Sequence, residues 1–201
     1  NQFNSATSYS GPAAIRLLRA SCGQTAHTDL YQSVDKKCFL LDNLSSLGFG
    51  QKLLMDHSGV FDDYLIHLRS FAGITAPLDS QLNLASKLVS FNGEPIYQDD
   101  LLLNRWLDER TKETNQPRVA TFMNMISLHD GNYYIDSKTT DYKTRAQVML
   151  DNLNTFLDTL EKSGRKVLVA IVPEHGAALV GDKMQIPGLR DIPSLNITHV
   201  P

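Results

Sequence analysis

The 201-residue sequence lacks any long hydrophobic run. Its longest apolar stretch covers only residues 167–173, whereas a membrane-crossing helix needs about 20 residues. The first residues are polar and lack the basic and apolar regions of a signal peptide. Because the chain starts and stops inside what reads as regular secondary structure, we expect it to be a piece of a longer protein.

An excess of charge of either sign is also missing. The 19 Lys and Arg residues nearly balance 22 Asp and Glu residues, for a net charge of −3, which argues against a nucleic-acid binder. No GxSxG, HExxH, Walker or GxGxxG pattern occurs, and this removes several classes of hydrolase and nucleotide-binding protein. The 42% apolar content is typical of a globular core.

Cysteine is scarce, with only Cys22 and Cys38. Their spacing is not that of a CxxC redox or metal motif. From the residues alone two interpretations stay open: two unrelated buried thiols, or a disulfide that closes a surface loop. A disulfide would contribute about 3 kcal/mol for a loop of this size and would indicate an oxidising compartment.

Helical and strand-like patterns alternate along the chain. Apolar periodicity predicts helices over residues 10–20, 37–47, 61–71, 99–112 and 144–160, and buried strands over residues 51–57, 119–126 and 166–172. Residues 73–95 have a looser pattern, interrupted by proline and glycine. This order predicts an α/β fold with a mostly parallel central sheet and helices on both faces.

Titratable residues follow each predicted strand: Asp56 with His57, His129 with Asp130, and Glu174 with His175. In parallel α/β folds, ligands bind beyond the carboxyl ends of the strands. If the three strands are neighbours, these side chains converge on one site.

The Glu174-His175-Gly176 sequence is a candidate metal site. A carboxylate and an imidazole reach the same ion where a strand gives way to a loop, and zinc accepts both kinds of ligand. The plainer interpretation is a solvated glutamate beside a histidine that caps the next helix.

Ser10 lies in a hydroxyl-rich segment, residues 4–12, that opens a predicted helix. A helix N-terminus attracts anions such as phosphate, and a serine hydroxyl becomes a nucleophile when a base or a metal removes its proton. The alternative is an ordinary helix cap. His129 is a candidate general acid, general base or hydrogen-bond donor to phosphate. The alternative is a loop histidine without a role, and the same two interpretations apply to His57.

Together, residues 4–19 (NSATSYSGPAAIRLLR) and 172–179 (VPEHGAAL) resemble the alkaline phosphatase and sulfatase superfamily. Within it they look very like the phosphoethanolamine transferases that act on bacterial cellulose. The similarity runs along the whole chain. It implies an alkaline phosphatase-like fold, with residues 1–201 as the central part of a single periplasmic catalytic domain that is truncated at both ends.

The resemblance also implies residue roles. Ser10 becomes the nucleophile and a zinc ligand, and Glu174 and His175 become two further zinc ligands. Related lipid A transferases use threonine and an Asp-His-Gly loop at these positions, so Ser10 and Glu174 depart from them but keep equivalent chemistry. The fourth ligand, a cysteine, is expected upstream of this chain.

Three further assignments follow from the same resemblance. His129 binds the phosphoryl group or protonates the leaving oxygen, while Tyr9 and Arg190 line the pocket, with Arg190 as a phosphate partner. Neither Cys22 nor Cys38 fits the position of the fourth zinc ligand, so the resemblance favours a disulfide between them.

The implied reaction moves phosphoethanolamine from phosphatidylethanolamine to the glucose 6-hydroxyl of cellulose through a phospho-serine. The implied setting is a periplasmic domain held to the bacterial inner membrane by segments absent here, with other cellulose synthase subunits as partners. A metal-dependent phosphatase or sulfatase that transfers to water, and a non-catalytic scaffold of a polysaccharide-secretion complex, remain as alternatives.

Overall fold

The computed structural model describes residues 4–5, 7–115, 117–138, 141–176 and 195–200. Its centre is a parallel pair of strands, β1 (Gly50–Met55) and β4 (Val119–Asn124). Within the described residues, no helix is both long and apolar enough to span a bilayer.

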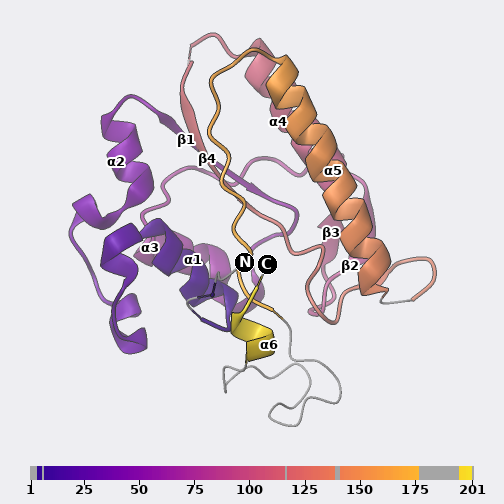
Figure 1. Cartoon of the computed structure of the whole chain (residues 1–201), viewed down its shortest axis with the longest axis horizontal. Coiled ribbons are helices and arrows are strands. Elements are labelled where there is room, and N and C mark those ends of the chain that lie inside the picture. Colours follow the sequence, from indigo (N-terminus) through magenta and orange to yellow (C-terminus); the bar gives the residue numbers. More distant parts are fainter. Residues whose placement is uncertain (1–3, 6, 116, 139–140, 177–194, 201) are drawn as a thin grey trace.

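Helices cover both faces of this pair, and the side chains of β1 show why. Adjacent side chains of a strand point to opposite faces. Leu53 and Met55 enter one hydrophobic core, whereas Leu54 enters another. The first core holds residues of α1 (Ser10–Leu18), α2 (Leu40–Ser46) and α3 (Tyr64–Phe71), and the second those of α4 (Asp99–Lys112) and α5 (Tyr142–Lys162). Figure 1 shows these two groups of helices on either side of β1 and β4. The predicted α/β class with two-sided helical cover is confirmed.

A second sheet was not predicted. The short strands β2 (Ser86–Val89), β3 (Pro95–Tyr97) and β5 (Tyr133–Tyr134) form an antiparallel sheet in the order β3-β2-β5. Strands this short carry too little apolar alternation to be recognised, and Gly93 and Pro95 interrupt the pattern.

The predicted buried strand over residues 166–172 is wrong. Its backbone joins no described sheet, and five of its apolar side chains are exposed, from 41% for Val172 to 95% for Leu168. Apolar composition indicates a capacity for burial, but a strand forms only where a neighbouring strand offers hydrogen bonds.

The helix starts also differ in detail from the predictions. The predicted helix over residues 37–47 is a 3-10 turn, η3 (Lys36–Cys38), followed by α2. In the predicted helix over residues 61–71, η4 (Phe61–Asp63) precedes α3 because Asp62 and Asp63 take positive φ values of 48° and 53°.

A disulfide joins Cys22 to Cys38, with their Cα atoms 5.5 Å apart. It links η1 (Ala20–Gly23), which follows α1, to η3 before α2. The interpretation of two unrelated thiols is therefore wrong, and the pairing that the resemblance implied is the one present.

The two described ends of the chain meet. Asn4 forms an antiparallel bridge with His199, just after the short helix α6 (Leu195–Thr198). Figure 1 shows α6 just below α1, so that the last described helix lies next to the first. This arrangement brings residues near the start of the chain to the segment around residue 175.

Candidate functional site

Ser10 is the first residue of α1 and is buried. The preceding residue, Tyr9, is the helix cap, with extended backbone angles of −132° and 146° and no capping bond from its side chain. The interpretation of Ser10 as an ordinary cap is therefore wrong. Its hydroxyl points instead toward a residue from the other end of the chain.

That residue is His175. Ser10 Oγ lies 3.3 Å from His175 Nε2, and Glu174 Oε2 lies 3.8 Å from the same nitrogen. The structure therefore brings a hydroxyl, an imidazole and a carboxylate together. The His175 side chain is almost completely buried, whereas Glu174 remains partly accessible.

A backbone contact sets the tautomer of His175. Its Nδ1 lies 2.7 Å from the carbonyl oxygen of Gly176. A carbonyl oxygen only accepts, so Nδ1 carries the hydrogen and Nε2 of the neutral ring presents a lone pair toward Ser10. Such a nitrogen either accepts the proton of the hydroxyl or binds a metal ion, and the Nδ1 contact orients the ring for both roles.

The chain ends hold this loop in place. The Gly176 amide donates to the Ile197 carbonyl at 2.7 Å, and the Ser5 amide donates to the Thr198 carbonyl at 2.6 Å. The Ser5 hydroxyl donates to the Glu174 carbonyl. Residues 4–5 and α6 therefore fix the backbone on both sides of the Glu174 and His175 side chains.

The three side chains fit the ligand preference of zinc. Oxygen and imidazole ligands suit this ion, which takes four ligands in most protein sites. The described part of the chain contains no group of three or more His, Cys, Asp or Glu side chains placed for a metal. Here the third oxygen or nitrogen donor is the Ser10 hydroxyl, so an ion of this kind would find three donors in Ser10, Glu174 and His175.

His129 follows β4 and belongs to a row of aromatic rings. Its ring stacks on Phe91 at 4.2 Å between centroids, and Phe91 meets Phe61 edge-on at 5.6 Å. Phe61 in turn stacks on Tyr64 at 5.2 Å. His129 Nδ1 lies 2.6 Å from the Asp130 carbonyl, which assigns its hydrogen in the same way as in His175.

Tyr64 is a residue of this site that the sequence analysis did not single out. Its side chain is buried, and no described group forms a hydrogen bond with its hydroxyl. Burial, together with the negative charge of Glu174, raises its pKa well above the ordinary value for tyrosine. Only its place on the apolar side of a predicted helix was visible in the sequence, and that signals a core residue.

His57 is a structural residue. It accepts a hydrogen bond at Nδ1 from the Gly59 amide at 3.0 Å, so its Nε2 donates to Asn124 Oδ1 at 2.9 Å. Burial lowers its pKa to about 4. The neutral ring ties the end of β1 to the end of β4 and supports no catalytic role.

Two further site candidates are Tyr9 and Arg190. Tyr9 is half-buried directly before Ser10, and its carbonyl accepts the first hydrogen bond of α1 from the Ala13 amide. Arg190 lies outside the described residues. The roles assigned to both remain predictions.

Comparison with known proteins places the chain in a family. The model of the cellulose biosynthesis protein BcsG C-terminal domain matches residues 1–201. The chain belongs to this family. It is 59% identical over 200 residues to the cellulose biosynthesis protein BcsG of Escherichia coli (strain K12), and 58% identical over 200 residues to that of Salmonella typhimurium (strain LT2).

Each alignment covers 99% of the chain but 36% of the relative. The chain therefore spans about a third of the length of these BcsG proteins. A larger protein is implied, of which this BcsG C-terminal region is one part.

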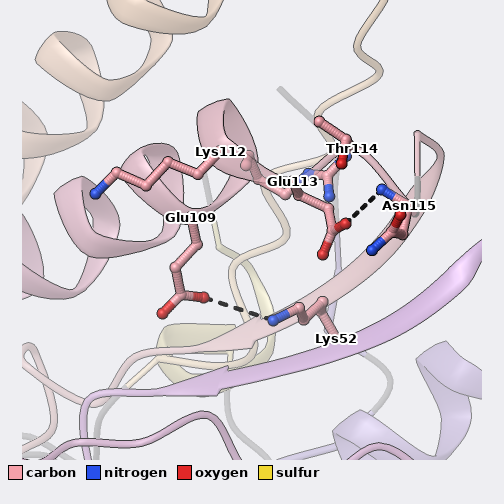
Figure 2. A pocket seen from close by; sticks show the side chains of 7 residues that line it. Lys52, Glu109, Lys112, Glu113, Thr114 and Asn115 are labelled. Atoms are coloured by element: carbon pink, nitrogen blue, oxygen red, sulfur yellow. Dashed lines mark hydrogen bonds and ion pairs between the residues drawn. The ribbon is translucent and has the colours of Figure 1, made fainter.

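A hollow elsewhere on this BcsG-family chain does not coincide with the site. It measures about 490 Å³ and lies between the last turns of α4 and the middle of β1. Figure 2 shows Lys52 paired with Glu109 there, at 3.5 Å, and the Asn115 amide donating to Glu113. Of the described residues, Tyr9, Ser10, His129, Glu174 and His175 do not line it.

Proposed function

We propose that the chain is the nucleophile-bearing part of a zinc-dependent phosphoethanolamine transferase that modifies cellulose. The observation that carries this proposal is the meeting of Ser10 Oγ, His175 Nε2 and Glu174 Oε2. Membership of a cellulose biosynthesis family supports cellulose as the acceptor. The buried serine, aligned with a nitrogen lone pair, supports nucleophilic chemistry.

The first half-reaction forms an ester on Ser10. Its Oγ attacks the phosphorus of phosphatidylethanolamine, and the bond from phosphorus to the diacylglycerol oxygen breaks. Diacylglycerol leaves with a proton, and phosphoethanolamine stays on the serine. Zinc held by Ser10, Glu174 and His175 would lower the pKa of the hydroxyl and offset the negative charge of the phosphoryl group.

The second half-reaction regenerates the serine. The 6-hydroxyl of a glucose unit attacks the phosphorus, the bond to Ser10 Oγ breaks, and the serine recovers a proton. We assign His129 to the phosphoryl group, as a donor or as the acid for the leaving oxygen. Tyr9 and Arg190 are assigned to the pocket lining.

The cellular setting is part of the same proposal. The disulfide between Cys22 and Cys38 supports an oxidising compartment, in agreement with a periplasmic domain. We place the chain in a single catalytic domain, anchored to the inner membrane by segments outside this chain and working beside other cellulose synthase subunits.

Mass spectrometry of peptides, produced after the full-length protein has been incubated with substrate, tests the proposal. After incubation with phosphatidylethanolamine, the peptide that contains Ser10 is expected to carry phosphoethanolamine, and cello-oligosaccharide is expected to remove it. Ser10→Ala should abolish the adduct, whereas Ser8→Ala, a change of the same chemistry two residues earlier, should retain it.

Other outcomes identify the alternatives. Release of phosphoethanolamine at the same rate with and without sugar would indicate a phosphatase-type hydrolase. Unchanged cellulose modification in cells that carry Ser10→Ala would indicate a scaffold.

A further inference from the structure

Two buried carboxyl groups share one hydroxyl at the carboxyl end of the parallel strands. Asp56 directly follows β1 and is completely buried, and Asp99, the first residue of α4, is 6% exposed. Ser127 lies between them. Its Oγ is 3.0 Å from Asp56 Oδ2 and 2.8 Å from both oxygens of Asp99.

A single hydroxyl hydrogen leaves one of the two contacts between Ser127 and the carboxyl groups without a hydrogen. The Ser127 hydroxyl has one hydrogen, so it donates to one carboxyl group only. Its close contact with the other is favourable when that second group is protonated and donates to the hydroxyl oxygen. The cluster is therefore complete with one proton bound to the pair, as in other pairs of adjacent buried acids.

The surroundings favour retention of that proton. Burial raises the pKa of Asp56 well above its ordinary value, with a further contribution from the charge of Asp99. Burial likewise raises the pKa of Asp99, to about 6, and Asp100 on the same helix adds negative charge. Arg145 of α5 packs next to the cluster, but its Nη1 donates to backbone carbonyls.

These groups hold the turn that carries His129. The Ile126 amide donates to both oxygens of Asp56 at 3.0 Å. Arg145 Nη1 donates to the carbonyl of Ser127 at 2.5 Å and to that of His129 at 3.1 Å. The His129 amide closes the turn on the Ile126 carbonyl at 2.8 Å.

We propose that Asp56, Ser127 and Asp99, with one shared proton, act together with Arg145 as a positioning unit for His129. The unit sets the backbone from which the imidazole extends, without contact with the substrate. Its relevance to catalysis rests on the proposed function, in which His129 faces the phosphoryl group. Its structural part stands independently of that function.

Hydrogen exchange of the intact protein tests the structural part without substrate. The peptide that covers residues 125–132 includes the Ile126 and His129 amides. As the pH is raised above about 6, protection corrected for the intrinsic rate should fall at least about tenfold in the wild type once the shared proton is lost. Asp56→Asn, which cannot lose a proton, should keep its protection throughout this range.

Two results would overturn the positioning unit. One is a fall in protection at the same pH in the wild type and in Asp56→Asn. Arg145→Lys keeps a cationic donor and Arg145→Met has none, so we expect the peptide to be less protected in Arg145→Met. Equal protection in these two variants is the second result that would overturn the proposal. Arg105→Met is the matched control, because Arg105 also donates to two carbonyls, of Ser80 and Leu82, on an exposed loop.

Transfer rates complete the test. Formation of the Ser10 ester in the wild type should decline over the same pH range in which protection falls, and Asp56→Asn should restore it at the alkaline end. Restored protection without restored ester formation would overturn the catalytic part of the proposal. If Ser10 forms no ester at any pH while exchange behaves as expected, the proposed function fails and the positioning unit remains.

Discussion

Ser10 Oγ and His175 Nε2 lie 3.3 Å apart although 165 positions separate the two residues along the chain. The contact depends on the antiparallel bridge between Asn4 and His199, which brings the start of the chain beside the loop that carries His175. The proposed nucleophile and its proposed base or metal ligand thus come from segments far apart in the sequence.

Removal of His175 should slow esterification of Ser10. His175→Ala takes away the lone pair that faces the hydroxyl, and general-base or metal-ligand loss of this kind costs about 10²- to 10⁴-fold. The rate of adduct formation on the Ser10 peptide measures the effect. The exposed His27→Ala, far from this loop in the chain, should react at the wild-type rate; an equally slow His27→Ala would point to a general disturbance of the protein.

Glu174 should control zinc binding. Glu174→Gln keeps the size of the side chain but removes the charge, and we expect zinc affinity to fall at least about tenfold. Metal content after dialysis against a zinc buffer measures this directly. Glu94→Gln, on a different loop, is the control. Equal zinc content in all three proteins would exclude Glu174 as a ligand.

The disulfide should stabilise the fold. Cys22→Ser with Cys38→Ser opens a loop with a sequence separation of 16, for which chain entropy predicts a loss of about 3 kcal/mol in the free energy of unfolding. Urea denaturation measures it. A reducing agent should destabilise the wild type by a similar amount and leave the double variant unchanged, and an unaffected wild type would contradict the prediction.

Acid should destabilise the protein through His57. Burial lowers the pKa of this histidine to about 4, below the value of about 6.5 for an unfolded chain. Between pH 4 and pH 6.5 the unfolded state therefore binds more protons than the folded state. The contribution of His57 to the free energy of unfolding is complete above pH 6.5 and falls by about 3 kcal/mol as the pH drops toward 4.

The variant His57→Asn separates this effect from general acid denaturation. Asparagine keeps an acceptor for the Gly59 amide but does not titrate, so its unfolding free energy should change less between pH 6.5 and 4 than that of the wild type. The exposed His27→Asn should follow the wild-type curve. Parallel curves for the wild type and His57→Asn would refute the assignment.

Because both faces of β1 are buried, truncation of a side chain on either face should lower the free energy of unfolding. Leu54→Ala removes methyl groups from the core beneath α4 and α5 and should cost 2 to 5 kcal/mol, the range for a buried leucine. Leu150→Ala, on the exposed side of α5, should change stability by less than about 0.5 kcal/mol. Similar small losses in both variants would show that this face of the sheet is open to water.

Much of the fold was predictable where local signals agree. The helix expected over residues 99–112 has the same bounds as α4, because acidic residues at its start and a heptad-like spacing of Leu102, Leu103 and Trp106 point to one structure. The strands β1 and β4 were recognisable by the short apolar runs that they contain. By contrast, residues 166–172 carry the same apolar signal without a described partner strand.

The residues of the candidate site also fall into those recognisable from the sequence and those revealed only by the packing. Ser10, Glu174, His175 and His129 are chemically distinctive residues beside predicted elements, so their candidacy could be recognised along the chain. Tyr64 could not be, since a tyrosine on an apolar helix face usually belongs to the core. Its relation to Glu174 exists only after α3 packs near the loop that follows residue 173.

The sequence by itself determined most of the helices, the two parallel strands and which side chains are able to do chemistry, because these properties depend on residues a few positions apart. Tertiary structure alone decided which of those side chains meet. The pairing of Ser10 with His175, and the sharing of Ser127 by Asp56 and Asp99, are distances between segments far apart in the chain. Such distances are set by the packing of the whole core rather than by any local pattern.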